Sequence, residues 1–186
     1  MIYEHLGDNR SGKTFTNALF AWEAFNLGRT VYCNCGKDAR GRSLHILNFP
    51  HRHYNFEDLR QMDLYECYVM SDESVEFMDA FDAPKRMMRE IGYFGYQATK
   101  RGVDWHYDAV RHKNIYNRVR LNPHYYIQSV RYPHNPKFPV QAIKLIIVSR
   151  YSSQAKTLWM RQPVLGRFFP IYNHVVLVPP REREDS

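Results

Sequence analysis

The residues best suited to chemistry lie near the amino terminus, in the stretch Gly7-Asp8-Asn9-Arg10-Ser11-Gly12-Lys13-Thr14. This stretch matches the pattern G-x-x-x-x-G-K-T of a phosphate-binding loop, the P-loop. Gly7 and Gly12 permit backbone angles that a side chain would block, so consecutive backbone N–H groups can turn inward around a phosphate. Lys13 adds a positive charge for the β- and γ-phosphates, and the Thr14 hydroxyl is a ligand for Mg²⁺.

The P-loop pattern requires a strand before it and a helix after it. Apolar residues from Phe15 to Phe25 recur at helical spacing, and Gly28 follows as a stop signal, so we predict a helix over 14–27. Its amino terminus directs positive charge at the same anion. The predicted nucleotide-binding residues therefore run from Gly7 to Phe15. The preceding segment 2–6 is a weaker strand, because polar Glu4 and His5 are unusual in the centre of a parallel sheet.

A second motif follows the segment Glu66–Met70, where an apolar strand runs into Ser71, Asp72 and Glu73. This is the Walker B pattern. Asp72 is expected to hold Mg²⁺ through its water, and Glu73 is expected to polarise the attacking water as general base. Ser71 lies where another apolar residue is usual. A structural alternative is that the two acids cap the start of a helix and occupy its first turn.

Charge is distributed unevenly along the chain. Residues 1–84 contain 8 Lys/Arg and 13 Asp/Glu, whereas residues 85–167 contain 16 Lys/Arg and 3 Asp/Glu. Such asymmetry indicates a polyanionic partner, duplex DNA in particular, for the middle and late part of the chain. Two structural alternatives remain: a solvated basic face, or arginines that pair with acidic residues of a neighbouring subunit.

The remaining pattern predicts an α/β fold with several further strands. We expect strands over 30–35, 103–107 and 125–130, helical segments within 76–96 and 111–120, and a loop over 131–139. Residues 142–149 and 156–160 read as a β-hairpin. His51 and His53 are assigned to a surface loop. We predict one domain over 1–180, with its core in 1–130, a β extension in 140–180 and a charged tail over 181–186.

Composition excludes a membrane-embedded protein and gives no sign of export. No apolar run approaches the roughly 20 residues of a membrane span, and no secretory signal precedes the P-loop. The odd number of cysteines, three, indicates a chain without a disulfide framework and a reducing compartment. We therefore predict a cytoplasmic protein, in the host cytoplasm if it is viral.

The order of motifs resembles the zonula occludens toxin-like branch of the FtsK–HerA superfamily of P-loop ATPases, which includes viral genome-packaging ATPases. The matching segments span most of the chain: Gly7–Thr14, Tyr32–Asn34, Met70–Ser74, Lys100–Asp104, Asn117–Arg120 and Phe168–Asn173. The resemblance implies a RecA-like, additional-strand (ASCE) sheet, mostly parallel and flanked by helices, and assembly into a hexameric or pentameric ring. It also implies a viral capsid or membrane-protein partner.

In that family the nucleotide lies between neighbouring subunits, and one subunit supplies an arginine to the site of the next. By resemblance, Arg118 and Arg120 are the candidates. Many relatives also place a polar sensor, often Gln, at the end of the fourth strand. In this sequence Val110 lies near that position. Either Asp108 or Arg111 acts as the sensor instead, or sensing of the γ-phosphate is weakened.

The sequence thus predicts Mg²⁺-dependent ATP hydrolysis that drives DNA translocation, with viral genome packaging as the main hypothesis. Lys13, Glu73 and an arginine form its catalytic set, and Thr14 and Asp72 bind the metal. Two alternatives stay open. One is an assembly or secretion ATPase that moves protein, and the other is a nucleotide-gated DNA-binding scaffold with little turnover.

Overall fold

The computed structural model describes residues 1–34, 47–55, 58–59, 61–72, 74, 78–80, 85–135, 137–152 and 154–172, and of residues 85–88 it describes the backbone alone. Within these ranges the strands are β1 (Ile2–Leu6), β2 (Val31–Cys33), β3 (Arg52–His53), β4 (Tyr68–Ser71), β5 (Asp104–Ala109), β6 (Tyr125–Tyr132), β7 (Ala142–Ser149) and β8 (Ala155–Arg161). They form one sheet in the order β3-β2-β4-β5-β1-β6-β7-β8.

The sheet is parallel from β3 to β6, and β7 and β8 extend it in antiparallel fashion. Strand β5 lies between β1, which leads into the P-loop, and β4, which leads into Asp72. This inserted strand is the additional strand that the resemblance implies. The fold class expected from the sequence is therefore confirmed, including the carboxy-terminal hairpin.

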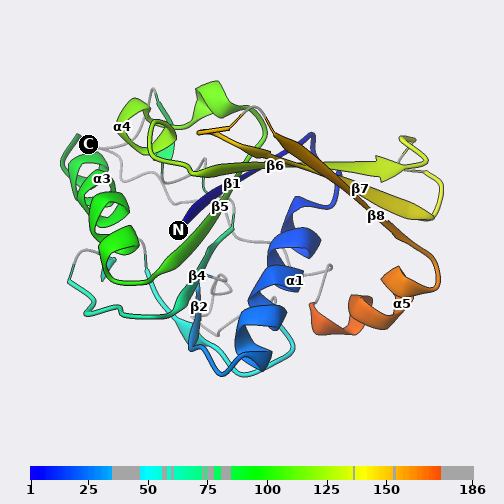
Figure 1. Ribbon diagram of the computed structural model, residues 1–186, viewed down its shortest axis with the longest axis horizontal. Helices are drawn as coiled ribbons and strands as arrows, with labels where there is room; N and C mark the ends of the chain where they lie inside the picture. Colours follow the sequence, from blue (N-terminus) through cyan, green and yellow to red (C-terminus); the bar gives the residue numbers. More distant parts are fainter. Residues whose placement is uncertain are drawn as a thin grey trace, which may run out of the picture.

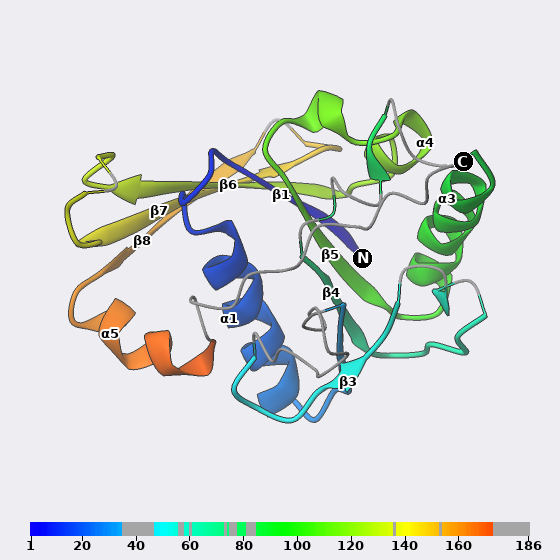
Figure 2. The same ribbon diagram turned by 180° about the vertical axis from the view of Figure 1, so that it is seen from behind.

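Helices cover both faces of the parallel part (Figures 1 and 2). In the described part of the chain the α-helices are α1 (Lys13–Asn26), α3 (Lys85–Lys100), α4 (Asn117–Arg120) and α5 (Val164–Phe168), and the 3₁₀ helices are η2 (His112–Asn114) and η3 (Phe169–Ile171). One core lies between the sheet and α1, where Ala18 and Ala21 are fully buried. Another lies beneath α3, whose Phe94 packs edge-on against Trp105. None of the described helices is long and apolar enough to cross a lipid bilayer.

The polar residues of β1 are fully buried in the centre of the sheet. Glu4 points to the α3 side and pairs with His112 Nδ1 at 2.6 Å, while His5 points to the α1 side and pairs with His106 at 2.9 Å. Burial raises the pKa of Glu4 to about 8. Burial, and secondly the charge of Lys13, lowers the pKa of His5 to about 3. Neutral side chains that bond to one another make this strand compatible with a central position.

Several local expectations need correction. The 51–53 segment is not only a loop, because Arg52 and His53 form the short parallel edge strand β3 beside β2. Strand β6 continues two residues beyond the predicted end, through Tyr132, because β7 pairs with it along its whole length. The helix expected over 111–120 is two short turns, η2 and α4. Cys33 is disulfide-bonded, so the expectation of reduced cysteines is wrong there, and Cys67 is a buried free thiol.

Candidate nucleotide-binding site

The P-loop connects the carboxyl end of β1 to the first turn of α1. Gly7 has a φ of 150°, Arg10 a φ of 65° and Gly12 a φ of 99°, so the turn uses the left-handed region repeatedly. Gly12 is also the N-cap of α1, where no side chain caps the helix. The free N–H groups of the first turn are therefore available to an anion, as a P-loop requires.

Both P-loop glycines lie against other strands. A Cβ on Gly7 would come within 2.7 Å of the Ser129 carbonyl oxygen of β6, and a Cβ on Gly12 would come within 2.9 Å of the Ile143 Cδ1 atom of β7. Real Cβ atoms essentially never approach so closely. The β extension is therefore in direct contact with the P-loop, and its first strand helps to fix the loop's shape.

Lys13 is buried, and its ammonium group folds back over the loop. It donates hydrogen bonds to the carbonyl oxygens of Gly7 at 2.7 Å and Asp8 at 3.1 Å. The Ser11 hydroxyl is buried and has no hydrogen-bond partner among the described residues. A buried cation and an unpartnered hydroxyl in one concave turn suit an anionic ligand such as a phosphate.

The structure brings Thr14 and Asp72 together, although 58 positions separate them in the chain. Thr14 Oγ1 donates to Asp72 Oδ1 at 3.0 Å, at the point where α1 begins and β4 ends. A hydroxyl and a carboxylate beside a phosphate-binding loop are the hard oxygen ligands that Mg²⁺ takes, together with phosphate oxygens and water. The residues present therefore fit Mg²⁺, which would neutralise phosphate charge there.

Asn34, at the end of β2, fixes the backbone of Asp72. Its Nδ2 donates to the Asp72 carbonyl oxygen at 2.8 Å, and its Oδ1 accepts from the Asp72 N–H at 2.7 Å. Both partners are buried. From the sequence, Asn34 is named only as part of the segment Tyr32–Asn34, which contributes to the family resemblance, and no role is predicted for it. An Asn directly after a strand was the available signal, because such a side chain can bond a neighbouring backbone.

Ser71 departs from the apolar Walker B pattern, and its surroundings explain why. Its hydroxyl accepts a hydrogen bond from Trp105 Nε1 at 2.8 Å and pairs with the Tyr54 hydroxyl at 2.5 Å. Tyr54 also donates to the Met70 carbonyl oxygen at 3.2 Å. An apolar residue at position 71 would leave the buried indole N–H of Trp105 without this acceptor and the Tyr54 hydroxyl without this partner.

Asp108 occupies the end of β5, near the position of the expected sensor. It is buried, and its Oδ1 accepts a hydrogen bond from the Ser74 N–H at 3.0 Å. Asp108 therefore fixes the backbone just after Asp72. Arg111 is exposed and Val110 half-buried. Of the two sensor candidates, Asp108 has a hydrogen bond to a described residue that follows β4, Ser74.

The other predicted residues lie elsewhere. Glu73 lies outside the described residues. Asp8, Asn9 and Arg10 are exposed on the loop tip. Phe15 is buried against Ile143 and Leu165, so its side chain belongs to the core.

Arg118 and Arg120 do not meet the P-loop of their own chain. They belong to α4, which packs on α3 at the opposite face of the sheet from α1 (Figure 1). Arg118 is exposed, and Arg120 donates to Asn117 Oδ1 at 3.2 Å.

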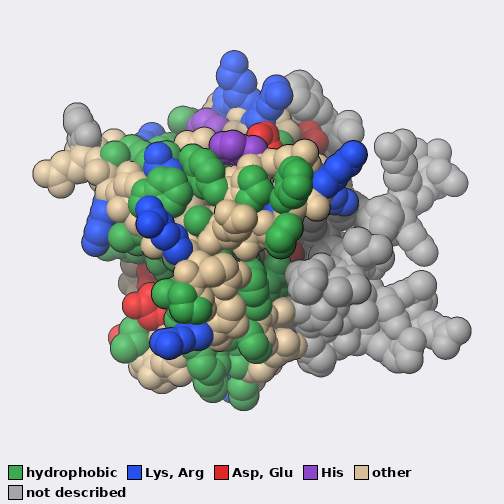
Figure 3. Space-filling view, turned by 90° about the vertical axis from the view of Figure 1, so that its right-hand side faces the viewer, with side chains coloured by type: hydrophobic (Ala, Val, Ile, Leu, Met, Phe, Trp, Pro, Cys, Tyr) green, Lys and Arg blue, Asp and Glu red, His purple; other side chains and the backbone are tan. Residues whose placement is uncertain are grey.

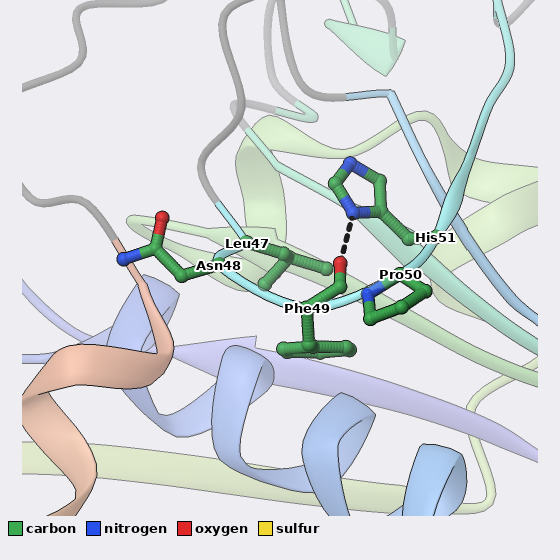
Figure 4. A pocket seen from close by; sticks show the side chains of 5 residues that line it. All are labelled: Leu47, Asn48, Phe49, Pro50 and His51. Carbon is green, nitrogen blue, oxygen red and sulfur yellow. Dashed lines mark hydrogen bonds between the residues drawn. The ribbon is translucent and has the colours of Figure 1, made fainter.

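A separate hollow of about 460 Å³ is lined by residues 47–51 (Figure 4). There His51 Nδ1 bonds to the Phe49 carbonyl oxygen at 2.8 Å, and Phe49 packs against Trp22 and Phe25. These contacts place the hollow against the carboxyl half of α1. It is therefore distinct from the P-loop, which precedes the other end of that helix.

Comparison with solved structures gives three informative neighbours. The N-terminal domain of zonular occludens toxin from Neisseria meningitidis has a TM-score of 0.62 at 14% identity, over 92% of this chain and 98% of that one. The genome packaging NTPase B204 from Sulfolobus turreted icosahedral virus 2, in complex with ATP-gammaS, has a TM-score of 0.59 at 13% identity, over 84% and 95%. The pCW3 conjugation coupling protein TcpA with ATPgS has a TM-score of 0.52 at 14% identity, over 86% and 59%.

No protein-family model matches the sequence, and no curated protein matches it. At these identities the likeness concerns the fold. The order of the strands, the P-loop between β1 and α1, and the inserted β5 agree with it. The chain has the fold of the P-loop NTPases, of the kind represented by the zonular occludens toxin domain and the B204 packaging NTPase.

Proposed function

We propose that the protein is a Mg²⁺-dependent ATPase whose turnover drives DNA translocation, with viral genome packaging as its main role. The observation that supports hydrolysis best is the 3.0 Å contact between Thr14 Oγ1 and Asp72 Oδ1 beside the P-loop. This contact joins the two predicted metal ligands, which come from distant parts of the sequence, at the edge where β1 and β4 both end.

In this proposal the chain's own residues divide the work of phosphoryl transfer. Lys13 exchanges the carbonyl oxygens of Gly7 and Asp8 for phosphate oxygens and stabilises the charge that develops on them. Glu73 orients the attacking water as general base. Asn34 holds the backbone of Asp72 and Asp108 holds that of Ser74, the described residues on either side of position 73 in the chain.

An arginine from a neighbouring subunit completes the proposed site. Arg118 and Arg120 lie on the opposite face of the sheet from α1, which is consistent with action across an interface in a ring. The motor role is supported by the B204 protein, which is a genome packaging NTPase, and by the excess of basic residues in 85–167. We treat residues 1–180 as one ATPase domain.

A phosphate-release assay with purified protein, ATP and Mg²⁺ tests the proposal, with and without duplex DNA. We expect release that requires Mg²⁺, increases with DNA and disappears in Lys13→Ala. Filter binding over a salt series tests the DNA partner, since backbone contacts weaken steeply with salt. Release that Lys13→Ala leaves unchanged would contradict hydrolysis at this site.

A second candidate is an assembly or secretion ATPase that moves protein, because the fold that the chain shares with the zonular occludens toxin domain does not specify what is moved. That candidate predicts ATP hydrolysis without salt-sensitive affinity for duplex DNA. A third candidate, a nucleotide-gated DNA-binding scaffold, rests on Val110 at the sensor position. Substantial DNA-stimulated phosphate release would exclude it.

A further inference from the structure

One face of the carboxy-terminal strands has no helix over it among the residues that the structure describes. Alternate residues of β6, β7 and β8 point away from α1 and form what we call the hairpin face: Val130, Tyr132, Lys144, Ile146, Trp159 and Arg161. On the other side of these strands, Ile143 and Leu145 are buried against Leu165 of α5. Figures 1 and 2 show α1 and α5 on that side and no described helix over the hairpin face.

The hairpin face combines half-buried apolar residues with exposed groups. Val130, Ile146 and Lys144 are half-buried, whereas Arg161 is exposed and Trp159 is 47% exposed. Strand β8 is exposed over most of its length on both faces. The end of the molecule toward which these strands project shows hydrophobic side chains interspersed with Lys and Arg (Figure 3). Such an exposed mixture on a regular surface is typical of an interaction site.

Trp159 is the centre of an ordered cluster. Lys144 Nζ lies 5.6 Å and Arg161 Cζ 5.8 Å from the centre of its ring, and the Tyr132 ring lies 5.1 Å away. Lys144 is the direct cross-strand neighbour of Trp159. Contact with the Trp159 ring therefore restricts the conformations of both cationic side chains on the sheet.

These cations lie in a segment without negative charge. Between Asp108 and Glu182 the sequence contains no Asp or Glu. None of the ion pairs between described residues involves Lys144 or Arg161. The hairpin face of a second copy would place cations against cations, which is unfavourable. A polyanion would neutralise these cations, because its charge is opposite to that of the surface.

We propose that the hairpin face binds the phosphate backbone of duplex DNA, through Lys144 and Arg161 beside Trp159. The choice of DNA as the polyanion rests on the proposed function, whereas the location rests on the two cations beside Trp159, of which Lys144 is half-buried and Arg161 exposed. The contact is independent of base sequence, because point charges on a flat sheet reach phosphates and not base edges. Strand β7 also lies against Gly12 of the P-loop through Ile143, so the strand that carries Lys144 borders the nucleotide site.

The test measures duplex DNA affinity over a salt series for the full chain and two double variants. Lys144→Ala with Arg161→Ala changes the hairpin face. Lys156→Ala with Arg167→Ala is the control, because it removes the same charge from exposed positions on the α5 side of the strands. We expect the first pair to lower affinity roughly 10- to 100-fold near ~0.1 M salt and to reduce the salt slope by about 2. The control is expected to change both much less.

ATP hydrolysis without DNA, measured in the same variants, separates this proposal from the proposed function. If Lys144→Ala with Arg161→Ala weakens DNA binding and leaves ATP hydrolysis unchanged, the result supports DNA binding at the hairpin face, even if the protein does not translocate DNA. If both double variants lose DNA affinity equally, the proposed location of the DNA-binding surface would be overturned. If the full chain binds oligo(dT) more tightly than duplex DNA, and the Lys144→Ala, Arg161→Ala variant loses affinity for both, the assignment to duplex DNA would be overturned.

If that variant keeps its DNA affinity but no longer self-associates in sedimentation, the hairpin face would instead bind a neighbouring copy of the chain, and the proposal would be overturned.

Discussion

Asn34 offers the sharpest test of how the fold positions the metal-binding carboxylate. Substitution by Ala removes both hydrogen bonds between Asn34 and the buried backbone of Asp72, at 2.8 Å and 2.7 Å. Removing the partner of a buried polar group costs about 1–3 kcal/mol per group. We therefore expect Asn34→Ala to lower the free energy of unfolding by roughly 3 kcal/mol, since water entering the gap offsets part of the cost.

The expected loss of stability corresponds to a fall in melting temperature of roughly 6–12 °C for a chain of this size. A shift of about 1 Å in Asp72 is enough to cost ~100-fold in turnover. We expect the kcat of Asn34→Ala to fall on that order and its half-saturating Mg²⁺ concentration to rise. Nucleotide affinity without Mg²⁺ should change little, because the P-loop is intact.

Two comparison variants make the Asn34 result interpretable. Asn34→Asp keeps the shape and the acceptor for the Asp72 N–H but places a carboxylate oxygen against the Asp72 carbonyl, so its Mg²⁺ dependence should shift as well. Asn48→Ala removes one exposed hydrogen bond, to the Pro170 carbonyl oxygen at 2.8 Å, and should leave kcat unchanged. A normal Mg²⁺ dependence in both Asn34 variants, alongside a lowered melting temperature, would refute the positioning role.

Four further predictions concern the site and the core. Lys13→Ala should abolish phosphate release, and Glu73→Gln should keep nucleotide affinity, measured by calorimetry, while release stops; normal release by Glu73→Gln would remove the assigned base. Gly7→Ala should lower the melting temperature and the nucleotide affinity together, because its Cβ meets the Ser129 carbonyl oxygen at 2.7 Å; an unchanged affinity would mean that the loop tolerates the shift. Burial raises the pKa of Glu4 from 4.5 to about 8, so the folded protein keeps a proton that the unfolded chain loses between these values, and stability falls as pH rises through that window. Between these two pH values, the free energy of unfolding of the wild type, measured by denaturant titration, should fall relative to that of Glu4→Gln by up to about 1.4 kcal/mol per pH unit. A difference in free energy of unfolding that does not change with pH would contradict a neutral buried carboxyl.

The elements that sequence predicted well are those with local signals. The spacing of the P-loop glycines and of the apolar residues after Phe15 is sufficient for α1, and the apolar run ending at Ser71 is sufficient for β4. The hairpin of β7 and β8 follows equally from two apolar runs and a short connection. In each instance the pattern lies within one element, so no distant partner is needed to recognise it.

The features that sequence left unexplained depend on distant contacts. Glu4 is unfavourable in a central strand until its partner, 108 positions away, is known. The role of Asn34 depends on backbone groups 38 positions away. Strand β3 has two residues and no alternation, so only its pairing with β2 defines it. Ser71 seemed a departure because its hydrogen-bond partners, Tyr54 and Trp105, come from other parts of the chain.

The most direct test of the central claim is a crystal structure with a non-hydrolysable ATP analogue and Mg²⁺. We predict phosphate oxygens within hydrogen-bond distance of the backbone N–H groups between Gly7 and Thr14, Lys13 Nζ turned from the loop carbonyls to the phosphates, and the metal beside Thr14 and Asp72. A nucleotide bound away from this loop, or a metal remote from Asp72, would contradict the account.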